Sequence, residues 1–359
     1  MNLCTISNKS IKLFTILYIV IVAILVCVTP FTQPEANILY SKSSNISTFV
    51  AQYFNNIFHN SCFIRLPFFT ISLLNIFLFK EVIKIYIDNN IYANLALFIF
   101  LITPGLFVSS ILVNYASFAI FITLLFIYSY YKKYRLLQVT SIVLLLFTNI
   151  ASFVFYIAIA IFTYRKKDWF LFFISIVLLI LSAIIDSYPI HGVPRGHLLQ
   201  VLAVYGVTLS PFYFFAVVYA IYRLAIDRKK TLLWYIVTSF FISSLILSFR
   251  QLIKITDFTP FVVISSILVV MVYQNSISVR LKIFQTSYKR VCSSILIVLL
   301  LETSIIAFNY PLYLLLGQNF KIMDTSIYTI AKISNNKCIN SINSRDKALY
   351  KYYGIKKCN

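Results

Sequence analysis

The sequence predicts an all-α fold, a polytopic membrane helix bundle with about eleven transmembrane helices. Composition supports this, since 60% of the residues are apolar and only 11% are charged. The mean hydropathy is +0.88. Apolar runs of membrane-spanning length also recur along the whole chain, separated by short polar stretches. Because lipid offers the backbone no hydrogen-bond partners, we expect these runs to be helices.

The apolar windows give the expected helices in chain order. No small-residue cleavage site follows the first window, 11–29, so we expect a retained anchor instead of a signal peptide. Windows 136–148 and 150–164 are shorter than the roughly 20 residues that a full span needs, which leaves one kinked hairpin as a second interpretation. The other windows are 66–87, 91–109, 115–131, 169–185, 201–222, 231–248, 258–274 and 291–309.

Basic residues predict the orientation of the bundle. Of the 31 Lys and Arg residues, 18 fall in alternate connections, whereas the intervening connections hold five. The positive-inside rule then places the N-terminus in the cytoplasm, and an odd number of spans places the C-terminal tail outside. We interpret the net charge of +21 mainly as a topology signal. No zinc finger, basic helix or stacking platform favours nucleic acid as a partner.

The predicted organisation is a bundle over residues 1–310 and a small extracytoplasmic tail over 311–359. The inner (plasma) membrane is the expected location, and the less routine polar residues fall in three outward loops. Loop 30–65 holds Glu35, Tyr40, His59 and Arg65; loop 186–200 holds His191, Arg195 and His197; loop 249–259 holds Arg250, Gln251, Lys254 and Asp257.

Cations beside a scarce carboxylate favour binding of an anionic head group carried by a lipid. Arginine makes forked hydrogen bonds to phosphate, and a carboxylate can accept a proton or help to hold a divalent cation. Simpler interpretations stay open: Arg65 and Arg250 as interfacial anchors, His191 and His197 as loop residues that bond to backbone, and Glu35 as a solvated residue after a turn. Glu302 lies inside the last window, where we expect it to face a partner or a cavity.

The six cysteines show no metal-ligand spacing. We interpret Cys27 and Cys292 as small apolar residues in or near spans. Cys338 and Cys358 both lie in the outward tail, where an oxidising compartment would allow a disulfide that closes a loop of about twenty residues.

Residues 65–133 carry two short marks, Arg65-Leu66-Pro67 at the start of the second span and Thr103-Pro104 after the returning helix. With these marks, about the first third of the chain resembles the polytopic GT-C glycosyltransferases. The pattern is similar to the bacterial enzymes grouped with the protein O-mannosyltransferases and the lipid A aminoarabinose transferases. The resemblance implies a GT-C-like bundle and polyprenyl-phosphate sugars as donors.

In that family a carboxylate in the first outward loop is the catalytic or metal-linked acid. The matching residue here is Glu35 in "PEANILY", with Pro34 in place of a first acid and Asn114 where a second acid is common. An amide can neither take a proton nor hold a metal strongly. This departure leaves open both a divalent-cation cofactor and an inactive member of the family.

We therefore expect a membrane glycosyltransferase that moves a sugar from a polyprenyl-phosphate carrier to an extracytoplasmic lipid, glycan or protein acceptor. Glu35 would be the general base or a metal-linked carboxylate, and three arginines would bind the donor phosphate: Arg65, Arg195 and Arg250. The remaining pocket candidates are Tyr40, His59, Asn114, His191, His197 and Gln251.

Two alternatives have different chemistry. A surface-polysaccharide polymerase or ligase would also use outward arginines, with lipid diphosphate sugars. A transporter or flippase ranks lower, because the sequence shows no convincing internal repeat and most of its scarce charges lie at the outer boundary.

Overall fold

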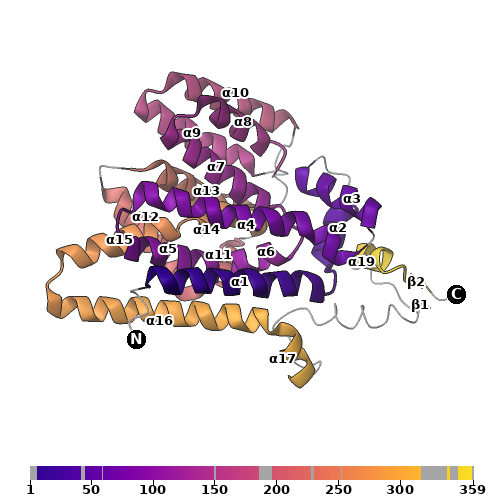
Figure 1. Cartoon of the computed structure of the whole chain (residues 1–359). Coiled ribbons are helices and arrows are strands. Elements are labelled where there is room, and N and C mark those ends of the chain that lie inside the picture. The colour runs from indigo at the N-terminus through magenta and orange to yellow at the C-terminus, as the bar shows by residue number, and fades with distance from the viewer. Residues whose placement is uncertain are drawn as a thin grey trace.

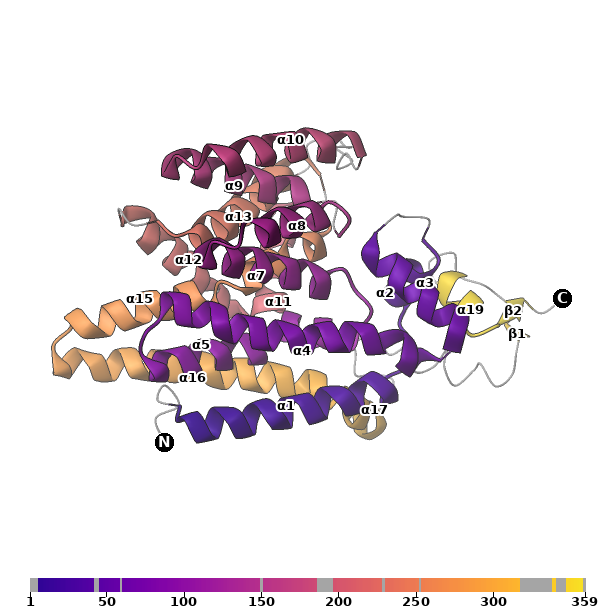
Figure 2. The same cartoon turned by 45° about the horizontal axis from the view of Figure 1, so that its top comes forward.

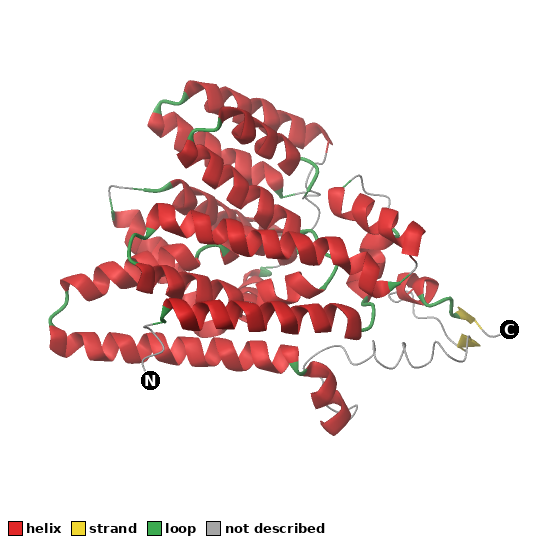
Figure 3. Ribbon diagram, viewed as in Figure 1, coloured by secondary structure: helices red, strands yellow, loops and turns green. Residues whose placement is uncertain are grey.

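The computed structural model describes residues 6–41, 45–58, 60–148, 151–185, 196–227, 230–251, 253–316, 338–339 and 347–357. Most of the described residues are helical (Figure 3). Besides the helices, the described residues form one pair of short parallel strands in the tail, β1 (Cys338–Ile339) and β2 (Lys356–Lys357). The predicted all-α class is confirmed.

The helices follow one another with short connections. Those of the N-terminal half are α1 (Asn8–Val28), α2 (Gln33–Leu39), α3 (Ile46–Phe58), α4 (Ser61–Tyr86), α5 (Asn90–Ile102), α6 (Pro104–Ile111), α7 (Ala116–Lys132), α8 (Arg135–Leu145) and α9 (Ser152–Lys166). Those of the C-terminal half are α10 (Trp169–Ile185), α11 (Leu198–Leu209), α12 (Pro211–Ile226), α13 (Leu232–Arg250), η1 (Ile255–Asp257), α14 (Thr259–Val263), α15 (Ser266–Val279), α16 (Lys282–Ala307), α17 (Asn309–Leu316) and α19 (Lys347–Tyr352).

Five helical stretches in the described part of the chain are long and apolar enough to cross a membrane: α1, α4, α13, α14 with α15, and α16. The pairs α5–α6 and α11–α12 pass the same test together but bend by 60° and 105°, which gives up to seven crossings. These helices indicate a membrane protein. A helix lies in each of the eleven predicted windows, with α8 and α9 as separate short helices; the count of eleven spans stays a prediction.

Proline and capping residues set several helix boundaries. Pro104 and Pro211 are the first residues of α6 and α12, so each of them interrupts a longer apolar run and starts a new helix. Asn60 and Asn89 cap α4 and α5 with their side-chain oxygens. The breaks of the two bent pairs therefore follow from the sequence itself.

The bundle has two unlike ends (Figures 1 and 2). At one end lie the N-terminus and the turns α4–α5, α12–α13 and α15–α16, which we call the basic end because basic residues cluster there. At the other end α2 and α3 lie beside α19, and we call these three helices the cap. Helices α8, α9 and α10 stack beyond α7 on one side of the bundle.

The cap replaces the long loop expected over residues 30–65, because most of that segment is helical. The C-terminal tail packs on it. The rings of Phe31 and Tyr352 stack with centroids 4.1 Å apart, and the Phe31 amide donates a hydrogen bond of 2.9 Å to the Tyr353 hydroxyl. Residues more than 300 positions apart in the chain thus form one small core at this end.

A disulfide joins Cys27 near the end of α1 to Cys62 at the start of α4. The interpretation of Cys27 as an ordinary small apolar residue is wrong, since its partner lies 35 residues away on the neighbouring helix. The predicted pair of Cys338 and Cys358 stays a prediction, because Cys358 and the side chain of Cys338 lie outside the described residues.

We predict that replacing Cys27 and Cys62 together by serine lowers the free energy of unfolding by about 3–4 kcal/mol, because a cross-link across a loop of this length restricts the unfolded chain. Denaturant titration of the purified protein under non-reducing conditions measures the change. Cys292→Ser is the control and should have little effect. Equal midpoints for the wild type and the double variant would contradict the prediction.

Candidate functional site

Glu35 and Arg65 form a buried, two-pronged ion pair between α2 and α4. The Arg65 Nε donates to Glu35 Oε1 at 2.7 Å, and Nη2 donates to Oε2 at 2.6 Å. Both side chains are fully buried. A pair of charges is stable in such a place only when the remaining polar atoms also find partners.

Arg65 uses its other donors on the backbone at the end of α1. Nη1 donates to the carbonyl oxygens of Val26 and Thr29 at 3.1 and 2.6 Å, and to the Thr29 hydroxyl at 2.8 Å. Nη2 also donates to the carbonyl oxygen of Pro30 at 2.9 Å. The guanidinium therefore satisfies the last carbonyl groups of a helix as well as Glu35.

Glu35 is saturated in the same way. Its Oε2 accepts from the amide and the hydroxyl of Thr32, both at 2.8 Å, and its Oε1 accepts from the amide of Val113 at 2.9 Å. Thr32 and Glu35 are the two ends of a capping box at the start of α2. Five donors thus surround a carboxylate that has about four lone-pair sites.

The pair ties together the end of α1, the start of α2, the first turns of α4 and the connection before α7. The structure brings Glu35 and Arg65 together, as the catalytic hypothesis requires, but it leaves neither a vacant lone pair on the carboxylate nor a vacant N–H on the guanidinium. A solvated Glu35 and a lipid-facing Arg65 are both wrong, because the two side chains are buried. We assign the pair a structural role.

Asn114 also has local partners. Its side-chain amide donates to the carbonyl oxygens of Ser109 and Leu112, both at 2.8 Å, and its oxygen accepts from the Ser117 amide at 3.1 Å. These bonds hold the turn between α6 and α7, which is the turn that supplies the Val113 amide to Glu35. Tyr40 lies in the cap, where the Lys351 ammonium is 4.2 Å from its ring centroid.

A second group of predicted residues lies where α11 begins and α13 ends. The His197 amide donates to the Ser248 carbonyl at 3.1 Å, and its Nδ1 lies 2.9 Å from the Gln200 side-chain oxygen. Two and three positions after Ser248, Arg250 is exposed and Gln251 is buried. The structure therefore places the start of α11 beside the last turn of α13.

Asp257 in η1 follows this group in the chain, and its carboxyl group is buried. Its side chain is 8% exposed. Burial raises the pKa of Asp257 to about 6, although the nearby Lys254 charge acts in the opposite direction. The sequence placed Asp257 in loop 249–259 but not among the catalytic candidates, because only the fold shows that it is buried.

Three of the predicted site residues, His59, His191 and Arg195, lie outside the described residues. Among the described residues, no cluster of three or more His, Cys, Asp or Glu side chains could hold a metal ion. The divalent cation stays a prediction.

Comparisons with protein-family models, with curated proteins and with solved structures find no match for this chain.

We predict that Glu35→Gln lowers the free energy of unfolding by about 3 kcal/mol or more, because it leaves the Arg65 charge buried without its counter-ion. Thermal unfolding of the detergent-purified variant measures this loss. Glu81→Gln is the matched control: it removes the carboxylate of an exposed pair with Lys84, where the side chains are 47% and 58% exposed, and should have almost no effect. A Glu35→Gln variant with wild-type stability and no activity would instead restore the catalytic hypothesis.

Proposed function

We propose that the protein is a membrane glycosyltransferase that moves a sugar from a polyprenyl-phosphate carrier to a lipid, glycan or protein acceptor, with Asp257 as the proton acceptor. The observation that carries this assignment is the buried carboxyl of Asp257, whose pKa is raised to about 6. A general base works best when its pKa lies near the operating pH. An acceptor hydroxyl could then transfer its proton to Asp257 as it attacks the sugar.

The neighbouring residues supply the other roles. Arg250 is exposed at the end of α13, seven positions before Asp257, where its guanidinium can bind the phosphate that leaves the sugar. Lys254 adds a second positive charge in the same connection. This proposal assigns the role of proton acceptor to Asp257 instead of Glu35. Arg250 binds the donor phosphate, as the sequence predicted.

The Cys27–Cys62 disulfide supports the proposed side of the membrane. Helix α1 starts at the basic end and α13 follows the basic connection 227–231, so the disulfide and Asp257 both lie toward the opposite end. Disulfides persist in oxidising compartments, and basic connections favour the cytoplasm. Both arguments favour a reaction on the extracytoplasmic face of the plasma (inner) membrane.

A transporter is the second candidate, and the two broken helices favour it. Broken helices at mid-membrane are a common feature of transporter binding sites. The breaks lie against each other: a Cβ atom on Gly105 in α6 would lie 2.9 Å from the Thr208 carbonyl oxygen in α11. The close approach of α6 and α11 therefore depends on a glycine.

Glu302 lies on α16 beside these breaks. Its carboxyl group faces the Ser210 hydroxyl at the α11–α12 break, and the following residue, Thr303, donates to the Ile102 carbonyl at the α5–α6 break at 2.7 Å. Although the two groups face each other, neither Glu302 Oε2 nor Ser210 Oγ forms a hydrogen bond of normal geometry within the described residues. An intramembrane carboxyl at a helix break is where a transporter would bind a cation or a proton.

We predict that Asp257→Asn lowers the rate of sugar transfer by about 100-fold or more, because an amide cannot accept the proton. The wild-type rate should rise with pH through about 6, as the carboxyl loses its proton, and then level off. Release of polyprenyl phosphate from polyprenyl-phosphate hexose and pentose donors, in liposomes containing envelope lipids as acceptors, gives the rate by mass spectrometry. Asp88→Asn, an exposed acid at the basic end, is the control. An unchanged rate in Asp257→Asn would refute the assignment.

We predict that Glu302→Gln changes this rate by less than about twofold, because Glu302 lies at the helix breaks and not at η1. The same liposomes, loaded with a fluorescent polyprenyl-phosphate sugar, report movement of lipid between leaflets. The transporter would be the better assignment if the wild type moves the lipid without releasing polyprenyl phosphate. In that case the movement should be lost in Glu302→Gln and kept in Glu81→Gln.

A further inference from the structure

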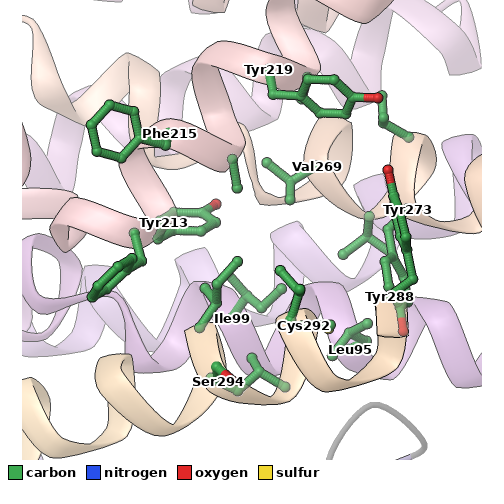
Figure 4. Close-up of a pocket in the computed structure, with 18 of the residues that line it drawn as sticks. Leu95, Ile99, Tyr213, Phe215, Tyr219, Val269, Tyr273, Tyr288, Cys292 and Ser294 are labelled. Carbon is green, nitrogen blue, oxygen red and sulfur yellow. The ribbon is translucent and has the colours of Figure 1, made fainter. Parts of the chain in front are cut away.

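A cavity of about 570 Å³ lies within the bundle between α5, α12, α15 and α16 (Figure 4). It contains neither the Glu35–Arg65 pair nor Asp257, and nothing in the proposed reaction uses it. Its volume falls in the range of small-molecule binding pockets. The cavity is therefore a separate candidate site.

Most of the cavity wall is apolar. Leu95 and Ile99 of α5 lie across the cavity from Val269 of α15, and Tyr213 and Phe215 lie at one end (Figure 4). Phe215 and Val291 are also 67% and 60% exposed on the outer surface of the bundle, so the cavity opens toward the surrounding lipid. A hydrocarbon chain is the ligand that such a wall favours.

The other end of the cavity is polar and positively charged. Tyr219, Tyr273 and Tyr288 gather there (Figure 4). Arg280, in the turn between α15 and α16, donates a hydrogen bond of 2.9 Å to the Tyr288 hydroxyl, and its guanidinium carbon is 3.7 Å from the centroid of the same ring. The guanidinium is thereby held at the mouth of the cavity.

Arg223, in the last turn of α12, adds a second charge at the same mouth. Arg223 lies four residues after Tyr219 and therefore one turn further along the same face of α12, whereas Arg280 is bonded to Tyr288 on the opposite wall. Both arginines are exposed, and within the described residues neither forms an ion pair with a carboxylate. Two unneutralised guanidinium groups at the mouth of an apolar cavity complement a phosphate attached to a lipid chain.

We propose that this cavity binds an anionic glycerophospholipid from the leaflet at the basic end, with an acyl chain between α5, α12, α15 and α16 and the phosphate at Arg223 and Arg280. The bound lipid is not the sugar donor. Helix α13, which runs from the basic end toward η1, has 19 residues and is about 28 Å long, so a phosphate at Arg280 cannot reach Asp257. The inference therefore stands whether or not the protein transfers sugar.

Native mass spectrometry of the delipidated, detergent-purified protein tests the site with palmitoyl-oleoyl phosphatidylglycerol as the probe. We expect phosphatidylglycerol to bind about tenfold or more tightly than phosphatidylcholine of the same chains, and the double variant Arg223→Gln with Arg280→Gln to lose this preference. The control is the double variant Arg165→Gln with Arg290→Gln, which removes two exposed arginines that do not line the cavity. It should keep the preference for phosphatidylglycerol.

A second variant tests the apolar part of the site. Ala216→Phe fills the cavity from α12 and should weaken binding of the probe, whereas Ala225→Phe, an exposed position on the same helix, should not. Circular dichroism and gel filtration check that both variants fold. Three results would overturn the proposal: equal binding of the two lipids by the wild type, an unchanged preference in the Arg223 and Arg280 double variant, or displacement of the probe by equimolar undecaprenyl phosphate, which would make the occupant an isoprenoid.

Discussion

The ion pair between Glu35 and Arg65 is the constraint on which the cap end of the molecule depends. Taking both charges out of water is unfavourable by several kcal/mol for each ion, and the pair persists because every polar atom of both groups is bonded. The partners of the pair lie on α1, on α2 and in the turn before α7. The Cys27–Cys62 disulfide links α1 to α4 beside it. A covalent and an electrostatic link thus fix the same two helices, and the cap and the C-terminal tail pack on that rigid base.

Much of the helical fold could be predicted from the sequence, because apolar runs in a membrane permit little except helices. The helix breaks at Pro104 and Pro211 are also visible there, as proline at the first position of α6 and α12. The structural role of Glu35 had a local signal as well. Thr32-Gln33-Pro34-Glu35 is a capping-box pattern, which predicts a short helix and bonds from the carboxylate back to Thr32.

The remaining features depend on tertiary contacts that no local pattern contains. The Val113 amide reaches Glu35 across 78 positions of the chain, and Cys62 reaches Cys27 across 35. The burial that distinguishes Asp257 from other loop acids arises only when η1 packs against α11 and α14. Glu35 is unusual in the sequence because acidic residues are scarce. Scarcity alone does not show whether a carboxylate stabilises the fold or takes part in proton transfer.

Three carboxyl groups illustrate this separation. Glu35 accepts hydrogen bonds from five donors, two of them on Arg65, so its carboxyl group has no vacant site for a substrate. Asp257 is buried, and its pKa of about 6 lets it gain and lose a proton near neutral pH. Glu302 lies at two helix breaks and has an oxygen without a partner in the described part of the chain. Proton transfer or ion binding requires a group whose two states are both accessible. We therefore propose the chemistry of this protein at η1 or at the breaks, and we assign to Glu35, although it matches the motif best, the rigid frame that supports either site.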